Sequence, residues 1–282
     1  MEFKTINVNG LDTFYREDGD PTKPTFLLLH GFPTASHLFR NLMPMLAQSF
    51  HVLAPDFIGF GQSAAPLHTD FDYTFDNLTN YVDGFLSALN VKQFYLYVFD
   101  YGAPIGFELA ARHPERILGI VSQNGNIYQE GLGAKWADRQ TYWQHPTAEL
   151  RQQYQTAFKA ATIKGQYLGG EQPGSVSPDG YTLDIHYTEL PDYAERQSDL
   201  IFDYQNNVKN YPRFQQYLRD NQPELIAAWG KNDPSFVYQG AQAFLKDDAN
   251  AEVHLLDGGH FVLESHWQTI GQLILDKWTV SN

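Results

Sequence analysis

Residues 98–110 read VFDYGAPIGFELA and carry the clearest structural signal in the chain. A short apolar run at residues 94–99 (FYLYVF) ends at Asp100, and Gly102 follows two residues later. This spacing predicts a strand that turns sharply into a helix and presents a polar side chain at the turn. Pro104 suits the first turn of that helix, where a missing backbone N–H costs nothing. An aspartate at this position can also be a simple helix N-cap, so its role depends on the rest of the sequence.

Short apolar runs alternate with helical stretches on both sides of this turn. Buried strands are expected at residues 25–29 (TFLLL), 51–54 (HVLA) and 118–122 (LGIVS), and helices at residues 38–48, 75–89 and 103–112. Strands that alternate with helices of this length predict an α/β protein, whose mostly parallel central sheet has helices on both faces.

The pattern changes near Asn126, after which the chain has no strong strand signal until about Pro212. Strand-like runs return at residues 225–229 (LIAAW) and 252–256 (EVHLL), followed by a closing amphipathic helix over residues 261–278. A helical insertion between two parts of one sheet is the simplest explanation. The predicted domains are therefore a first core part at residues 1–127, a helical cap at residues 128–213, and a second core part at residues 214–282.

Composition excludes several classes of function. The 282 residues include 19 basic and 33 acidic side chains, a net charge of −14, and no cysteine. A negative surface disfavours nucleic acid and anionic membranes as partners, and the lack of cysteine excludes disulfides and thiolate chemistry. The N-terminus lacks a basic flank followed by an apolar stretch, and no apolar run is long enough to cross a bilayer. We expect a cytoplasmic protein that binds a small molecule; the sequence does not assign its oligomeric state.

Ligands of open parallel sheets bind beyond the carboxyl ends of the strands, so the residues just after each strand are candidates for chemistry. Asp100 is one, Asp233 in WGKNDP is the second, and His260 in DGGHF is the third. Taken separately, Asp233 fits an ordinary Asp-Pro turn and His260 fits a surface histidine. Their order along the chain is that of a nucleophile, an acid and a histidine base. Glu130, beyond the strand at residues 118–122, remains an alternative acid.

The HGFP sequence at residues 30–33 follows the first core strand. The backbone N–H of Phe32 is expected to pair with that of Tyr101 to form an oxyanion hole. His30 is interpreted as a structural hydrogen-bonding residue. Ser63 in GFGQS is a weak alternative nucleophile, because no strand-to-helix turn surrounds it.

Five segments in the same order resemble the Asp-nucleophile branch of the α/β-hydrolase fold, which includes epoxide hydrolases and haloalkane dehalogenases. They are HGFP (30–33), PDFIGFGQS (55–63), VFDYGAPIGFELA (98–110), WGKNDPSF (229–236) and GGHFVLE (258–264). The resemblance implies that Asp100 is the nucleophile, His260 the base, and Asp233 the acid that orients the histidine. It implies a covalent aspartyl ester with a small apolar substrate, and it requires no metal or organic cofactor.

The leaving group is the open question. Epoxide opening is the first expectation, and Tyr204 lies at the place of one of the two ring-opening cap tyrosines of epoxide hydrolases. Arg139 occupies the aligned position of the other, so Tyr142 or Tyr154 would have to take that role. Dehalogenation is the alternative, although Tyr101 and Phe32 stand where many dehalogenases have Trp and Asn. A ligand-binding receptor of the same fold, without enzymatic activity, is the third hypothesis.

Overall fold

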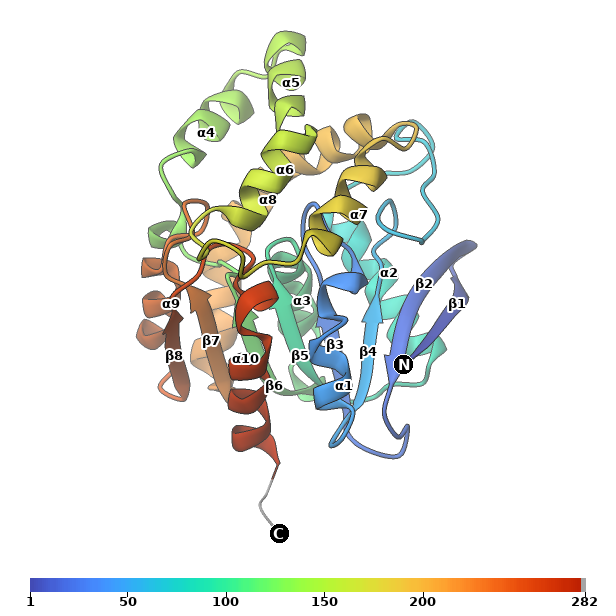
Figure 1. Ribbon diagram of the computed structural model, residues 1–282, viewed down its shortest axis with the longest axis vertical. Coiled ribbons are helices and arrows are strands. Elements are labelled where there is room, and N and C mark those ends of the chain that lie inside the picture. Colours follow the sequence, from blue (N-terminus) through green and yellow to red (C-terminus); the bar gives the residue numbers. More distant parts are fainter. Residues whose placement is uncertain (280–282) are drawn as a thin grey trace.

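A sheet of eight strands forms the centre of the molecule in the computed structural model, which describes residues 1–279 (Figure 1). The strands lie in the order β1-β2-β4-β3-β5-β6-β7-β8. They are β1 (Glu2–Val8), β2 (Leu11–Asp18), β3 (Thr25–Leu29), β4 (His51–Pro55), β5 (Phe94–Phe99), β6 (Ile117–Gln123), β7 (Leu225–Gly230) and β8 (Ala251–Leu256). Strand β2 pairs antiparallel with β1 and β4, and the remaining neighbours pair in parallel. The predicted α/β fold with a mostly parallel sheet is confirmed.

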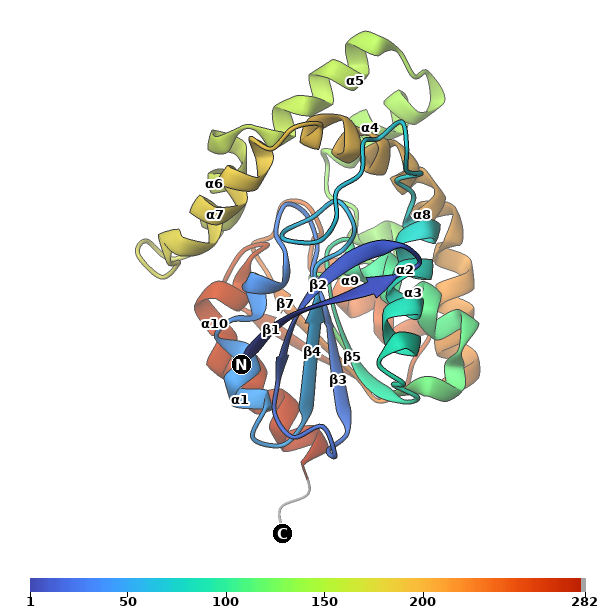
Figure 2. The same ribbon diagram turned by 90° about the vertical axis from the view of Figure 1, so that its right-hand side faces the viewer.

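Helices cover both faces of this sheet. Figure 2 shows α1 and α10 on one face and α2 and α3 on the other. The helices are α1 (Leu42–Leu46), α2 (Phe75–Ala88), α3 (Gly102–Arg112), α4 (Trp136–Gln144), α5 (Ala148–Tyr154), α6 (Ala160–Leu168), α7 (Pro178–Thr188), α8 (Tyr193–Asn221), α9 (Gln239–Ala243) and α10 (Val262–Trp278). The central strands β3 and β4 are buried along their whole length because both faces are covered, which explains their continuous apolar sequence.

One expected helix differs from the structure. Residues 38–48 form a short 3-10 turn at Ser36–Phe39 followed by the five-residue helix α1. Pro44 lies within this region and lacks the backbone N–H that would bond to the carbonyl of Arg40, so one continuous helix is disfavoured.

The helices α4 to α8 lie between β6 and β7 in the chain, where the helical cap is expected. In Figures 1 and 2, α4 to α7 sit above the carboxyl ends of the parallel strands, and α8 descends from them beside α3. Helix α8 continues through residue 213 to Asn221, so the expected cap boundary falls inside a helix. The placement of α4 to α7 leaves the ends of β5, β6 and β7 facing the cap.

Within residues 1–279, no helix combines the length and apolar character that crossing a bilayer requires.

Candidate active site

Asp100 occupies the turn between β5 and α3 in a backbone conformation that an aspartate rarely adopts. Its φ is 47°, in the left-handed region, and its side chain is buried. Two glycines make room for this turn: a Cβ on Gly102 would lie 2.3 Å from the carbonyl oxygen of Leu29, and one on Gly31 would lie 2.4 Å from the Asp100 Cβ. The backbone N–H of Phe32 donates to Asp100 Oδ1 at 2.7 Å. The strain and the close approach together hold this carboxylate in one orientation.

His260 and Asp233 meet Asp100 at the same edge of the sheet. His260 lies between β8 and α10, and its Nδ1 is 2.7 Å from Asp233 Oδ2. Its other ring nitrogen, Nε2, is 3.6 Å from Asp100 Oδ2. The structure therefore brings together the three residues that sequence patterns selected, with the histidine between the two carboxylates.

The pKa values of His260 and Asp233 shift in opposite directions. Burial alone would lower the pKa of His260, but the carboxylates of Asp233 and Asp100 outweigh it and raise that pKa from 6.5 to about 9. Burial would raise the pKa of Asp233, whereas His260 and two further hydrogen-bond donors, the Ser235 N–H and the Asn124 amide, lower it below its usual value. These two shifts favour an ion pair between a protonated His260 and an ionised Asp233 at neutral pH.

Asn124 is a further member of this site that the sequence interpretation did not select. It follows directly after β6, and its Nδ2 donates to Asp233 Oδ2 at 2.8 Å while its Oδ1 accepts from the Gly230 N–H at 2.9 Å. Its φ of 46° is tolerated best by glycine and asparagine. The rule that selected Asp100, a polar side chain directly after a buried strand, applies equally to Asn124. A second donor to Asp233, the backbone N–H of Ser235, reaches Oδ1 at 2.7 Å.

A family model for the alpha/beta hydrolase fold matches residues 24–266, which span the sheet from β3 onward and all three residues of this triad. The chain belongs to the α/β-hydrolase fold family. An uncharacterised hydrolase of Saccharomyces cerevisiae is 42% identical and spans 98% of this chain and 97% of its own length. A haloalkane dehalogenase of Mesorhizobium japonicum is 46% identical over 89% of this chain and 83% of its own. A crystal structure of the haloalkane dehalogenase DbeA from Bradyrhizobium elkani shares the fold, with a TM-score of 0.80 at 24% identity, covering 98% of this chain and 97% of that one. The protein is a hydrolase related to the haloalkane dehalogenases.

A cavity of about 280 Å³ opens over Asp100. Its walls come from the core and the cap: Phe32, Asp100, Tyr101, Lys135, Trp136, Asp138, Arg139, Gln153, Tyr154, Thr156, Ala157, Thr162, Gln166, Ser235 and His260. Both residues expected to form the oxyanion hole lie in this wall. The Phe32 amide already contacts Asp100, whereas the hydrogen bonds found among residues 1–279 include no acceptor for the Tyr101 amide.

The three candidate tyrosines differ in position. Tyr154 lines the cavity. Tyr204 is fully buried next to it, with its hydroxyl 3.5 Å from that of Tyr211 and its ring 4.7 Å from the ring of Trp136. Tyr142 packs against Tyr154 with ring centroids 5.0 Å apart and is absent from the cavity wall. Only Tyr154 of the three is therefore placed to contact a substrate in this cavity.

Two cationic side chains in the cavity wall were not selected from the sequence. Lys135 precedes α4 and Arg139 lies in its first turns, and both line the cavity that holds Asp100. One signal for Arg139 was present in the sequence, since it occupies the aligned position of a ring-opening tyrosine. Its charge makes the cavity more polar than the small apolar substrate predicted from the sequence requires.

The residues considered as alternatives for the base, the acid and the nucleophile have other hydrogen-bond or ion-pair partners. The His30 ring accepts from the Phe57 N–H at Nε2 (3.0 Å), so Nδ1 donates to the Gly31 carbonyl oxygen, and burial lowers the pKa of His30 to about 4. This agrees with a structural role. Glu130 is paired with Lys246 away from the cavity, and the Ser63 hydroxyl donates to the Asp56 carbonyl oxygen at 2.7 Å.

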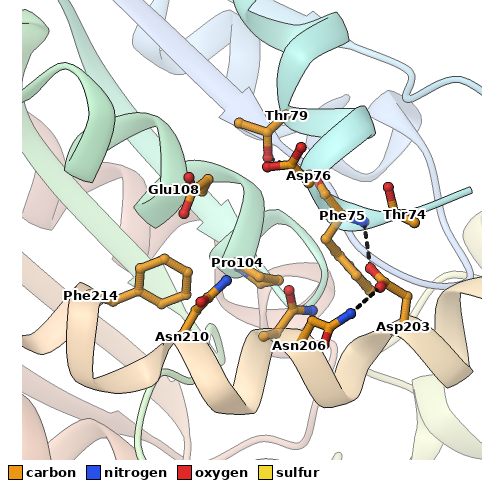
Figure 3. Close-up of a pocket in the computed structure, with 11 residues that line it drawn as sticks. Thr74, Phe75, Asp76, Thr79, Pro104, Glu108, Asp203, Asn206, Asn210 and Phe214 are labelled. Atoms are coloured by element: carbon orange, nitrogen blue, oxygen red, sulfur yellow. Dashed lines mark hydrogen bonds between the residues drawn. The ribbon is translucent and has the colours of Figure 1, made fainter.

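A separate cavity of about 170 Å³ lies between α2, α3 and α8 (Figure 3). Its carboxylates have protein partners: Asp203 accepts from the Phe75 N–H at 2.8 Å and from Asn206 at 2.7 Å, and Glu108 pairs with Arg213. It contains no nucleophile beside a histidine, which distinguishes it from the cavity over Asp100. Among residues 1–279, no group of three or more His, Asp or Glu side chains is placed to bind a metal ion.

Proposed function

We propose that the hydrolase forms an ester between Asp100 and a saturated carbon of a small substrate, and then hydrolyses that ester. The observation that carries this proposal is the carboxylate of Asp100, held at the sharp turn by the Phe32 amide with His260 Nε2 3.6 Å away. A carboxylate that attacked an ordinary ester would form an anhydride, which is a poor intermediate. Attack on a carbon that bears a leaving group gives a stable alkyl ester instead.

Two steps follow from this arrangement. In the first, an Asp100 oxygen forms a bond to carbon while the bond to the leaving group breaks, and that group takes the electron pair. In the second, His260 removes a proton from water, whose oxygen attacks the Asp100 carboxyl carbon. The amides of Phe32 and Tyr101 would hold the resulting oxyanion, each donor typically contributing about 3–4 kcal/mol. Collapse expels the alkoxide, which leaves as the alcohol with the proton that His260 carried. The Asp100 carboxylic acid that remains releases the second proton of the water to solvent and is again a carboxylate.

The pKa of His260 couples these two steps. In the free enzyme Asp233 and Asp100 together raise it to about 9. Esterification removes the charge of Asp100, so the pKa of His260 falls just when the neutral imidazole is needed as a base. Asp233 keeps its charge and stabilises the imidazolium as it forms.

Halide release is the leaving-group chemistry that the combined findings support best. A relative that is 46% identical over 89% of this chain is a haloalkane dehalogenase. Tyr101 directly follows the nucleophile and lines the cavity, and burial raises the pKa of its hydroxyl, which keeps it a hydrogen-bond donor for a departing halide. The indole N–H of Trp136 is less suited, because it donates to the Ser235 carbonyl oxygen at 2.9 Å.

Epoxide opening is the second candidate, and the position of Tyr154 favours it. An epoxide needs an acidic hydroxyl near the developing alkoxide, and Tyr154 lines the cavity. Tyr204 and Tyr142 add little support, since neither is part of that wall.

The test is mass spectrometry of the His260→Gln variant after separate incubation with 1-bromobutane and styrene oxide. The variant lacks the base for the second step, so an ester should accumulate on the peptide that contains Asp100. An adduct from the bromide supports dehalogenation, and one from the epoxide alone supports the second candidate. The control is the double variant Asp100→Asn, His260→Gln, which should remain unmodified. No adduct from either compound would refute the aspartyl-ester proposal for these substrates and favour a receptor that binds without reacting.

A further inference from the structure

Lys135 and Arg139 are the unusual feature of the cavity, because they place two positive charges beside a carboxylate nucleophile. Within residues 1–279, neither has an acidic group within 4 Å. Two half-buried arginines elsewhere in the chain are paired: Arg40 lies 2.7 Å from Glu264, and Arg151 lies 2.8 Å from Asp199. The cations in the cavity wall are thus available to a ligand.

Their positions are fixed by the fold. Lys135 is the N-cap residue of α4 and Arg139 is four residues later, so both side chains project from the same face of the helix. The Arg139 guanidinium lies 4.3 Å from the centre of the Trp136 ring. Trp136 is itself held by its hydrogen bond to Ser235 and by stacking on Phe236 at 5.2 Å. Stacking occupies the flat face of the guanidinium and leaves its N–H edges for a planar anion.

Both cations act on the reacting groups. Lys135 is an exposed residue, yet partial desolvation beside the cavity lowers the pKa of its ammonium and the charge of Arg139 lowers it further. The nearby charges of Asp233 and Asp100 oppose that shift. Arg139 lowers the pKa of both Tyr101 and Tyr154, against the larger effect of their burial. These groups therefore share one electrostatic environment with the nucleophile.

We infer that the substrate carries a carboxylate, which Arg139 and Lys135 bind above Asp100. This inference rests on the proposed aspartyl-ester mechanism and names its substrate class: short 2-halo or 2,3-epoxy carboxylic acids. A neutral haloalkane needs no positive charge for binding. An anionic substrate does need it, since its carboxylate must approach Asp100 in a chain of net charge −14.

The charges in the cavity suit a monoanion. The ionised Asp233 and the protonated His260 balance each other. Lys135 and Asp138 both line the cavity and are both exposed, so water screens their opposite charges alike. The half-buried Arg139 is therefore the principal cation for one anionic group of a substrate. The hydroxyls and amides of Thr162, Gln153 and Gln166 complete a polar wall.

Matched pairs of probes test the inference for either leaving group. The pairs are 2-bromopropanoate with 1-bromopropane, and glycidate with glycidol. For the pair that reacts, the measured quantity is the ratio of kcat/KM for the carboxylate to kcat/KM for the neutral compound. The wild type should favour the carboxylate, and Arg139→Gln and Lys135→Gln should each lower the ratio at least about tenfold, as expected for a charge-assisted bond. The matched control, Lys159→Gln, removes a cap cation that lies outside the cavity wall and should leave the ratio within about twofold.

A binding measurement covers variants with poor turnover. Lactate, the product expected from 2-bromopropanoate, should bind the wild type in calorimetric titration and bind Arg139→Gln at least about tenfold more weakly. A wild type that consumes the neutral probe in preference to the carboxylate, or an unchanged ratio in Arg139→Gln, would overturn the inference and leave the aspartyl ester intact. Failure of all four probes to modify Asp100 in the His260→Gln variant would instead count against the proposed function itself.

Discussion

Replacing Asp233 by asparagine tests how the buried acid acts on His260. Asp233 Oδ1 accepts from the Ser235 N–H at 2.7 Å, and Oδ2 lies 2.8 Å from the Asn124 amide and 2.7 Å from His260 Nδ1. An asparagine that keeps its oxygen on Ser235 turns its NH₂ group toward two donors. The histidine then loses both the negative charge and the acceptor that fixes its tautomer.

The magnitude follows from the pKa of His260. Its rise from 6.5 to about 9 corresponds to roughly 3 kcal/mol of preference for the imidazolium, to which Asp233 and Asp100 both contribute. Once Asp100 is esterified, Asp233 is the remaining source of that preference. Asp233 supplies only part of that preference, so its loss predicts that ester hydrolysis slows by at least about tenfold. The first step should change less, because the Asp100 carboxylate attacks without a base.

The assay is a single-turnover experiment with a reactive bromide, quenched at intervals and analysed for ester on the Asp100 peptide. Asp233→Asn should accumulate ester that the wild type clears. Glu130→Gln is the matched control, because Glu130 is the alternative acid and pairs with Lys246 on the surface. Hydrolysis by Asp233→Asn within about threefold of the wild type, or equal loss in Glu130→Gln, would refute this reasoning.

Other groups around the nucleophile give three more expected outcomes. The folded-state pKa of His260, about 9, exceeds its usual 6.5, so the stabilisation by its charged form is complete below pH 6.5 and is lost as pH rises through 9. In urea unfolding, the difference in unfolding free energy between wild type and His260→Gln should therefore shrink from pH 6.5 to 9, and a constant difference would contradict this prediction. Tyr154→Phe should slow ester formation from styrene oxide about tenfold or more, whereas Tyr204→Phe should change it less than about threefold, because the Tyr204 hydroxyl is buried against Tyr211; equal effects would remove Tyr154 from the reaction. Asn124→Ala removes the amide donor to Asp233 Oδ2 and the acceptor of the Gly230 N–H, and should lower the unfolding free energy by at least about 2 kcal/mol. Asn124→Gly accommodates the φ of 46° and should be less destabilised; the reverse order in urea unfolding would show that backbone strain is unimportant.

Local patterns in the sequence were enough to predict the sheet and the positions of three key residues. Apolar runs of strand length mark buried parallel strands, and Asp100, Asp233 and His260 each follow one of them. The carboxyl ends of parallel strands meet at one edge, so residues distant in the chain must come together there. The structure has this proximity, with His260 between the two carboxylates.

The identity of the residues over the nucleophile depended on tertiary structure. The sequence favours Tyr204 as one ring-opening tyrosine and leaves Tyr142 or Tyr154 as the second. The face of each helix that meets the sheet is set by long-range packing, and of these three only Tyr154 reaches the cavity. The same packing brings Lys135 and Arg139 over Asp100, although in the sequence they are two charges on a polar helix. The end of a strand is positioned by the backbone hydrogen bonds to its neighbouring strands, whereas a cap side chain is positioned by the tertiary packing of its helix. The sequence by itself therefore determined the parallel sheet and the edge where Asp100, Asp233 and His260 meet, and only the tertiary structure decided which cap side chains line the cavity there.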